Sequence, residues 1–307
     1  MRIGLSGGAS SVDRMIEQAV QAEADGFTSL WYASAIGGDP LIAIALAGRA
    51  TTSLELGTAV LQTYTCHPVL QANRAAAVVA AMGRAGFTLG VGPSHQPVIE
   101  MAYGVSYAHP GRHTEEYVAL LARLLRGEAV DFAGEEFNVR GAGRALKPEE
   151  TVPLLVSALG PRLLRVAGEV ADGTVLWMAN ARAIEVHVAP RIRAAADAAG
   201  QPTPRIVAGL PVAVHDDVDE AREAAAAQFA GYGALPNYRR ILDIGDAGGP
   251  ADAAILGDER SVVAAIHGLF DAGATDVWAA VFPVGEDRRE SRDRTRKVLQ
   301  RLAAGDS

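Results

Sequence analysis

Eight short apolar runs, each followed by at least one segment of helical periodicity, are the feature that most restricts the fold of this 307-residue chain. The runs span residues 3–6, 29–33, 54–60, 87–92, 153–157, 174–177, 206–212 and 276–282. Apolar runs of this length that alternate with longer helical segments are typical of βα units around a parallel sheet. Eight such units close a ring, so we expect an α/β fold of the (β/α)8 TIM-barrel type, with a single domain over residues 1–307.

A doubly wound open sheet is the alternative fold for the same alternation. Its dinucleotide-binding fingerprint would follow the first strand, where the sequence reads Gly4-Leu5-Ser6-Gly7-Gly8 and has the wrong spacing. The barrel is therefore favoured. The apolar periodicity predicts helices over residues 12–25, 40–50, 68–82, 112–125, 161–170, 182–199, 218–229, 261–271 and 289–303.

Two stretches interrupt the regular alternation and predict insertions. After the fourth helix, the runs Val130-Asp131-Phe132 and Phe137-Asn138-Val139 flank a short turn and predict a small β-hairpin. Between the seventh and eighth strands, residues 229–260 are punctuated by glycine and proline. A loop of that length inside a compact domain is usually functional, so we expect a lid there.

Composition excludes several function classes. With 36 acidic and 28 basic residues the net charge is −8, so binding to nucleic acid or to an anionic membrane is not expected. The single cysteine, Cys66, cannot form an internal disulfide. His109, His113 and Glu116 have a loosely ligand-like spacing, but Pro110 interrupts any shared helical face, so no metal site is expected. The only lysines, Lys147 and Lys297, do not follow a glycine, which excludes a Walker A phosphate loop. No run reaches the 18 apolar residues of a membrane span and no signal peptide is evident, so we expect a cytoplasmic protein.

The residues at the carboxyl ends of the predicted strands would form the mouth of the barrel, where such folds carry their active sites. They are mostly small, amide or hydroxyl side chains, flanked by the aromatic residues Trp31, Tyr64 and Trp177. They include no pair of carboxylates for acid–base catalysis and no lysine for covalent catalysis. Such a mouth suits a flat aromatic cofactor, which brings its own reactivity and needs mainly shape, stacking and a few hydrogen bonds.

Two local motifs lie at this mouth. The segment Ser157-Ala158-Leu159-Gly160-Pro161-Arg162 joins the fifth strand to a helix. Its free amides and its glycine fit a phosphate-binding corner, and they fit an ordinary strand-to-helix turn equally well. His95, in Gly92-Pro93-Ser94-His95, is the only histidine directly at a strand end. It fits a general acid or a hydrogen-bond donor to a bound ring, and also a structural turn residue.

Three segments in order along the chain carry a family resemblance: residues 57–61 with 64–68, residues 157–162 with 167–173, and residues 257–259 with 271–276. They read Gly-Thr-Ala-Val-Leu with Tyr-Thr-Cys-His-Pro, Ser-Ala-Leu-Gly-Pro-Arg with Ala-Gly-Glu-Val-Ala-Asp-Gly, and Gly-Asp-Glu with Asp-Ala-Gly-Ala-Thr-Asp. Together they resemble the bacterial-luciferase-like flavin and deazaflavin oxidoreductases, and in particular their coenzyme F420-dependent actinobacterial branch. The resemblance covers essentially the whole chain.

The resemblance implies a set of cofactor-binding positions. A cis peptide follows the third strand in this family, which matches Ala59–Val60, and forms a bulge behind the central ring of the cofactor. The loop after the second strand matches Ala33 and Ser34, and the loop after the fourth strand matches Gly92, Pro93, Ser94 and His95. The cofactor phosphate binds the backbone after the fifth strand, which matches Ala158, Leu159, Gly160, Pro161 and Arg162.

The sequence departs from several relatives at the positions of ionisable groups. Those relatives carry an ionisable residue after the second strand and a carboxylate after the fourth, whereas this chain has Ala33-Ser34 and Pro93-Ser94-His95. By elimination, His95 is the candidate catalytic residue.

The resemblance implies hydride transfer between C5 of coenzyme F420 and a small organic substrate. Two alternatives stay open: a monooxygenase that uses FMN in the same pocket, and a non-catalytic flavin- or deazaflavin-binding protein of the same fold. A homodimer is expected from the family alone, and no residue specifies the substrate.

Overall fold

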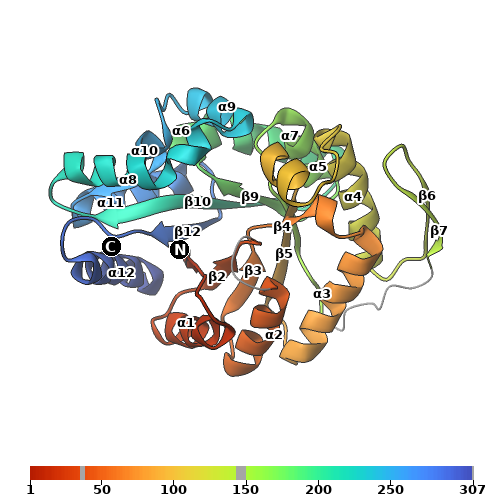
Figure 1. Cartoon of the computed structure of the whole chain (residues 1–307), viewed down its shortest axis with the longest axis horizontal. Helices are drawn as coiled ribbons and strands as arrows, with labels where there is room; N and C mark the ends of the chain where they lie inside the picture. Colours follow the sequence, from red (N-terminus) through yellow and green to blue (C-terminus); the bar gives the residue numbers. More distant parts are fainter. Residues whose placement is uncertain (35–38, 143–149, 306–307) are drawn as a thin grey trace.

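All eight predicted apolar runs form parallel strands, and these strands close into a barrel in the computed structural model (Figure 1). The structure describes residues 1–34, 39–142 and 150–305, so Lys147 lies outside the described residues. β1 pairs with both β2 and β12, and β9 pairs with β10, which closes the ring. In order around the barrel the strands are β1 (Arg2–Ser6), β2 (Ser29–Tyr32), β3 (Glu55–Thr58), β5 (Phe87–Gly92), β8 (Leu154–Val156), β9 (Gly173–Trp177), β10 (Arg205–Val214) and β12 (Asp276–Val281).

Helices surround this barrel at the predicted places, and their starts follow from local capping chemistry. Ser11, Asp39 and Asp287 each accept a hydrogen bond from a backbone N–H in the first turn of a helix. Proline occupies the first turn of several others, where no amide partner is lost. The helices are α1 (Val12–Ala24), α2 (Pro40–Ala50), α3 (Pro68–Met82), α4 (Pro110–Leu125), α5 (Pro161–Glu169), α7 (Ala189–Ala199), α8 (Val218–Gly233) and α12 (Arg288–Ala304), with α6 (Ala181–Ala183) and the π-helical η3 (Ile184–Val188) leading into α7.

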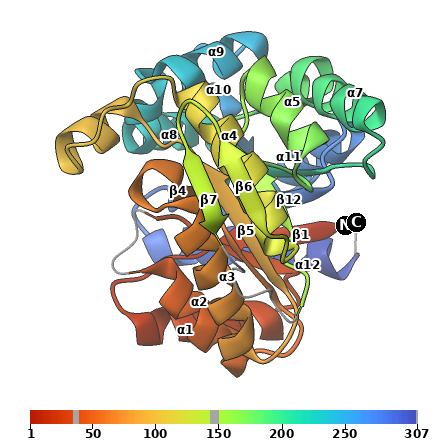
Figure 2. The ribbon, with the colours of Figure 1, turned by 90° about the vertical axis from the view of Figure 1, so that its right-hand side faces the viewer.

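The predicted hairpin after α4 is present. β6 (Val130–Ala133) and β7 (Asn138–Ala142) pair antiparallel on the outer surface of the barrel beside α4 (Figures 1 and 2). The Glu116 carboxylate of α4 accepts hydrogen bonds from three consecutive backbone amides of the turn, those of Glu135, Glu136 and Phe137. The Glu116 carboxylate therefore anchors the hairpin to α4.

The prediction of a long loop over residues 229–260 is wrong. α8 continues to Gly233, and then come α9 (Pro236–Ile244), α10 (Pro250–Ala253) and β11 (Ile255–Gly257), which pairs parallel with β10 and leads into α11 (Glu259–Asp271). The prolines read as breakers are the first residues of α9 and α10. Three shorter elements follow barrel strands: β4 (Leu61–Gln62) with η1 (Thr63–Thr65) after β3, and the π-helical η2 (Val98–Ala102) after β5.

In the middle of the barrel, each of two tryptophans packs against a glycine on a neighbouring strand. A side chain on Gly57 of β3 would lie 2.4 Å from the Trp31 ring, and one on Gly209 of β10 would lie 2.0 Å from the Trp278 ring. Each indole therefore occupies the space that its neighbouring strand leaves free. Leu155, Val175 and Val207 complete this apolar layer in a cluster with the two tryptophans.

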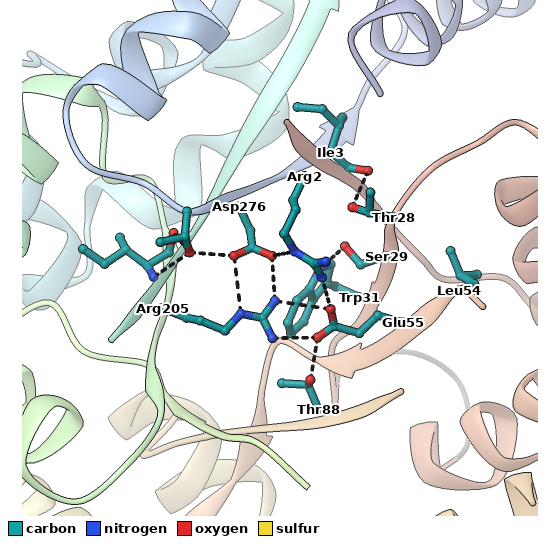
Figure 3. A network of polar contacts seen from close by, with 12 residues as sticks. Arg2, Ile3, Thr28, Ser29, Trp31, Leu54, Glu55, Thr88, Arg205 and Asp276 are labelled. Carbon is teal, nitrogen blue, oxygen red and sulfur yellow. Dashed lines mark hydrogen bonds and ion pairs between the residues drawn. The ribbon is translucent and has the colours of Figure 1, made fainter. Parts of the chain in front are cut away.

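A network of opposite charges closes the amino-terminal end of the barrel (Figure 3). Its members are the first residues of four strands: Arg2, Glu55, Arg205 and Asp276. Arg205 donates from Nη2 to Asp276 at 2.6 Å and from Nη1 to Glu55 at 2.9 Å, and Arg2 bonds the same two carboxylates. Burial opposes ionisation of Asp276, but the donations from Arg205 outweigh it and lower the pKa of Asp276. The charged groups at this end satisfy one another.

Candidate active site

A cavity of about 880 Å³ lies at the opposite end of the barrel, at the carboxyl ends of the strands. Its size falls within the roughly 300–1,000 Å³ of typical small-molecule sites. The lining comes from the ends of β1, β9 and β12, from the loops after β2, β3, β5 and β8, and from α1, α8, α9 and α12. This is the end at which barrels of this type carry their active sites.

Six of the residues proposed from the sequence line this cavity: Ala33, Ser34, Ala59, Val60, Ser94 and His95. The peptide bond between Ala59 and Val60 is cis, as the family resemblance implied. Gly92 lies just behind the lining, where an added Cβ would be 2.8 Å from Cβ of Ser157 and 3.1 Å from Cγ2 of Val60. The missing side chain at position 92 thus lets the loops after β3 and β8 meet at the cavity wall.

Ser94 is held in a left-handed conformation, with φ of 63°, by two hydrogen bonds. The Tyr107 hydroxyl donates to the Ser94 carbonyl at 2.8 Å, and Nε2 of Gln62 donates to the Ser94 hydroxyl at 3.1 Å. Non-glycine residues adopt this conformation rarely, so the surrounding contacts fix it. Its effect is to fix the backbone that carries His95.

His95 is the titratable group on the β5 side of the cavity. Its ring centroid lies 5.4 Å from that of Tyr238 on α9. Burial lowers the pKa of His95 from its usual 6.5, so the imidazole is neutral near pH 7. A neutral imidazole offers one N–H donor and one acceptor nitrogen, which allows it to donate a hydrogen bond or to accept a proton.

The segment after β8 lies beside the cavity, and Ser157 is its contribution to the lining. Ala158 and Leu159 are buried, and the Leu159 carbonyl lies 2.9 Å from Nε2 of His187. Gly160 precedes α5 as its N-cap, and an added Cβ there would meet only Nη1 of Arg240, at 3.8 Å. The amides at the start of α5 have no side-chain cap, so the corner is open to an anion.

Pro161 and Arg162 at the start of α5 are exposed. Nε of Arg162 donates to Glu115 at 2.7 Å, and Arg165 bonds the same carboxylate. The Arg162 guanidinium is therefore already engaged by α4. Neither residue lines the cavity.

The structure corrects the aromatic surroundings expected from the sequence. Trp177 lines the cavity, but Trp31 is buried in the barrel interior, and Tyr64 stacks on His113 with ring centroids 3.8 Å apart, away from the lining. The aromatic residues that the sequence analysis missed are Trp278, Phe229, Tyr232 and Tyr238. Trp278 was predictable in principle, because side chains alternate along a strand and Trp278 shares one face of β12 with Ala280 near its carboxyl end.

Comparison with known proteins identifies the family. The family model described as luciferase-like monooxygenase matches residues 1–303. The chain belongs to the luciferase-like monooxygenase family. It is 30% identical over 217 residues to the 5,10-methylenetetrahydromethanopterin reductase of Methanolobus tindarius, an alignment that covers 70% of this chain and 65% of that protein.

Solved structures of this luciferase-like fold superpose over nearly the whole chain. An F420-dependent secondary alcohol dehydrogenase in complex with an F420–acetone adduct gives a TM-score of 0.76 at 20% identity and covers 97% of both chains. The oxygenating constituent of 3,6-diketocamphane monooxygenase from Pseudomonas putida, in complex with FMN, gives 0.68 at 18% identity and covers 99% of this chain and 97% of that one. At these identities the likeness concerns the fold.

The cavity of this luciferase-like protein has the chemistry of a site for a flat ring. Its deep part is small and aromatic, and Asp293 on the α12 side is the only carboxylate among the described residues that line it. Over the described residues, no group of three histidine, cysteine, aspartate or glutamate side chains could hold a metal ion. Within the same ranges, no helix has the length and apolar character needed to cross a bilayer.

Proposed function

We propose that this protein is an oxidoreductase that binds coenzyme F420 in the cavity and transfers hydride between C5 of the deazaflavin and an electron-poor double bond of a small organic substrate. The family and the named activities of its relatives support an oxidoreductase role. The choice of F420 rests on the resemblance of the chain to the F420-dependent branch and on the fold it shares with an F420-dependent dehydrogenase.

The observation that carries the proposal is the contrast between the size of the cavity and its few ionisable groups. The 880 Å³ volume accommodates a tricyclic ring with a substrate beside it. The lining at the strand ends consists largely of small and aromatic side chains and supplies no acid–base pair. A bound deazaflavin would supply the hydride chemistry that these side chains lack.

The chain's own residues would hold the ring, exclude water and handle one proton. Ala59 and Val60 line the cavity after β3, and Trp177 and Trp278 line it from β9 and β12. His95, neutral because of its burial, would donate a hydrogen bond to the substrate oxygen or accept a proton from an alcohol substrate. Tyr232 and Tyr238, on α8 and α9, reach the cavity from the insertion and would act as its lid.

The open corner at Gly160 would receive the phosphate of the cofactor through backbone amides. Because Arg162 is bonded to Glu115, we assign it a role in positioning α5 against α4. A homodimer is proposed from the family alone, and size-exclusion chromatography with light scattering tests it.

The alternative cofactor is FMN, which a structural neighbour of the same fold binds. Parallel titrations with F420 and with FMN, followed by quenching of cofactor fluorescence, separate the two. Tighter binding of F420 supports the proposal, and a preference for FMN overturns it in favour of a monooxygenase. Cofactor binding without turnover of any acceptor would indicate a binding protein of the same fold.

A further inference from the structure

An indole N–H without a partner lies at the floor of the cavity. Trp278 on β12 is only 7% exposed, and its Nε1 is fully buried with no hydrogen-bond partner among the described residues. A buried donor left without an acceptor is unfavourable. Because Trp278 also lines the cavity, a molecule bound there can supply the missing acceptor.

The surroundings of Trp278 hold this donor in one place. One face of the indole lies against the backbone of Gly209, where a Cβ would be 2.3 Å from Nε1. Trp177 stacks on it with ring centroids 5.2 Å apart and an interplanar angle of 23°. The side chain is therefore confined between a strand and a second ring, and its N–H is a fixed donor.

Trp31 offers a direct comparison within the same interior layer. It is equally buried and also packs on a glycine of the neighbouring strand, but its Nε1 donates to the Ser29 hydroxyl at 2.9 Å. It does not line the cavity. The barrel thus satisfies the indole that lies outside the lining, whereas Nε1 of Trp278 and Nε1 of Trp177, the two tryptophans that line the cavity, have no hydrogen-bond partner among the described residues.

We propose that Trp278 is a ligand-binding residue whose indole N–H donates to a carbonyl oxygen on the edge of the planar ring bound in the cavity. The pyrimidinedione edge shared by flavins and deazaflavins has the required chemistry, because its carbonyl oxygens are acceptors that lie in the ring plane. This inference rests on the proposed function. Because FMN and F420 share this edge, a hydrogen bond from Trp278 would not distinguish them. Selectivity between the two cofactors would then come from other residues.

The test compares Trp278→Phe with Trp31→Phe, which removes the same atoms from the same layer. Dissociation constants for FMN and for F420 are measured with thermal unfolding as the check on folding. We expect Trp278→Phe to weaken the better-bound cofactor about tenfold and Trp31→Phe to leave its affinity within about twofold. Equal affinities in the wild-type protein and Trp278→Phe would overturn the inference alone. Failure of the wild-type protein to bind either cofactor would overturn the proposed function and this inference with it.

A second measurement works on the wild-type protein, so it does not depend on the folding of Trp278→Phe. The chain has three tryptophans, and 15N labelling gives three indole N–H signals, of which Trp278's is the one retained in both Trp31→Phe and Trp177→Phe. On addition of the bound cofactor, that signal should move downfield and exchange more slowly with solvent. An unchanged exchange rate would contradict the hydrogen bond.

Discussion

The two ends of the barrel treat polar groups in opposite ways. At the amino-terminal end, Arg2, Glu55, Arg205 and Asp276 bond one another across four strands. At the carboxyl end, His95 lines a cavity and the N–H of Trp278 has no hydrogen-bond partner within the part of the chain that the structure describes. The polar groups of the amino-terminal end therefore stabilise the fold, whereas those of the carboxyl end are available to bind a ligand.

The largest effect is expected at the charged end. Asp276→Asn removes the charge of a buried carboxylate and leaves the partly buried Arg205 with an incomplete set of partners, so the free energy of unfolding should fall by about 3 kcal/mol. Urea denaturation measures it. Asp293→Asn on α12 is the matched control: its ion pair with Arg289 is exposed and 3.9 Å long, so it should cost less than about 1 kcal/mol. Equal losses in the two variants would erase the proposed difference between the ends.

The next effect belongs to the cavity end and to catalysis. His95→Gln should lower kcat about 100-fold with the best acceptor from a panel of aldehydes, ketones and enones, because it removes the group that exchanges a proton. The free energy of unfolding should change little. His267→Gln, on α11 outside the lining, is the control. If turnover and cofactor affinity both survive the loss of His95, its assigned role is wrong.

A smaller effect is expected at the phosphate corner. Gly160→Val should weaken cofactor binding about tenfold, because a β-branched side chain crowds the amides that start α5. Folding should be unaffected, since an added Cβ meets only Nη1 of Arg240, at 3.8 Å. Gly249→Val provides a matched control, because Gly249 also precedes a helix that begins with proline and has open space around it. An unchanged dissociation constant for Gly160→Val would place the phosphate elsewhere.

The smallest effect is a difference in acid sensitivity. The pKa of Asp276 is lowered in the folded protein, so its contribution to stability is present above the unfolded-state pKa of about 3.9 and is lost as the pH falls through the folded pKa. The pKa of His95 is also lowered in the folded protein, so its effect on stability begins at higher pH. The unfolded chain takes up a proton at His95 as the pH drops below about 6.5, and this favours unfolding. Unfolding measured from pH 7 to pH 3 should therefore lose the His95 contribution first, and His95→Gln should flatten the upper part of that profile.

The barrel was predictable because each of its strands coincides with a short apolar run in the sequence. β5 begins and ends where the run Phe87–Gly92 does, and the glycine and proline signals located α2 and α3 to the residue. The failure over residues 229–260 has the same origin. Pro236 and Pro250 were read as breakers, although proline is also a good first residue of a helix, and only packing against the barrel decides between the two.

The candidate site was predictable to the extent that it lies on strand ends. Residues of the loops after β2, β3 and β5 were found that way, whereas Tyr232 and Tyr238 come from the insertion and carried no local signal. Trp278 and Trp31 each lie in an apolar run, but in the structure Trp278 lines the cavity without a partner for its N–H among the described residues, whereas Trp31 lies outside the lining and is hydrogen-bonded. The partner of Trp31 is Ser29, two residues earlier on the same strand, whereas the residue two before Trp278 is Asp276, whose carboxylate is bonded to Arg2 and Arg205.

The pairing of each interior tryptophan with a glycine on the adjacent strand also makes the depth of the cavity adjustable. The apolar layer formed by the two rings with Leu155, Val175 and Val207 separates the pocket from the charged network at the amino-terminal end. Exchanging Trp278 for a smaller side chain would lengthen the chamber and expose the Gly209 surface as new wall, but it would also remove the donor proposed for the ring edge. Redesign toward longer acceptors would therefore have to supply a replacement donor for the bound ring.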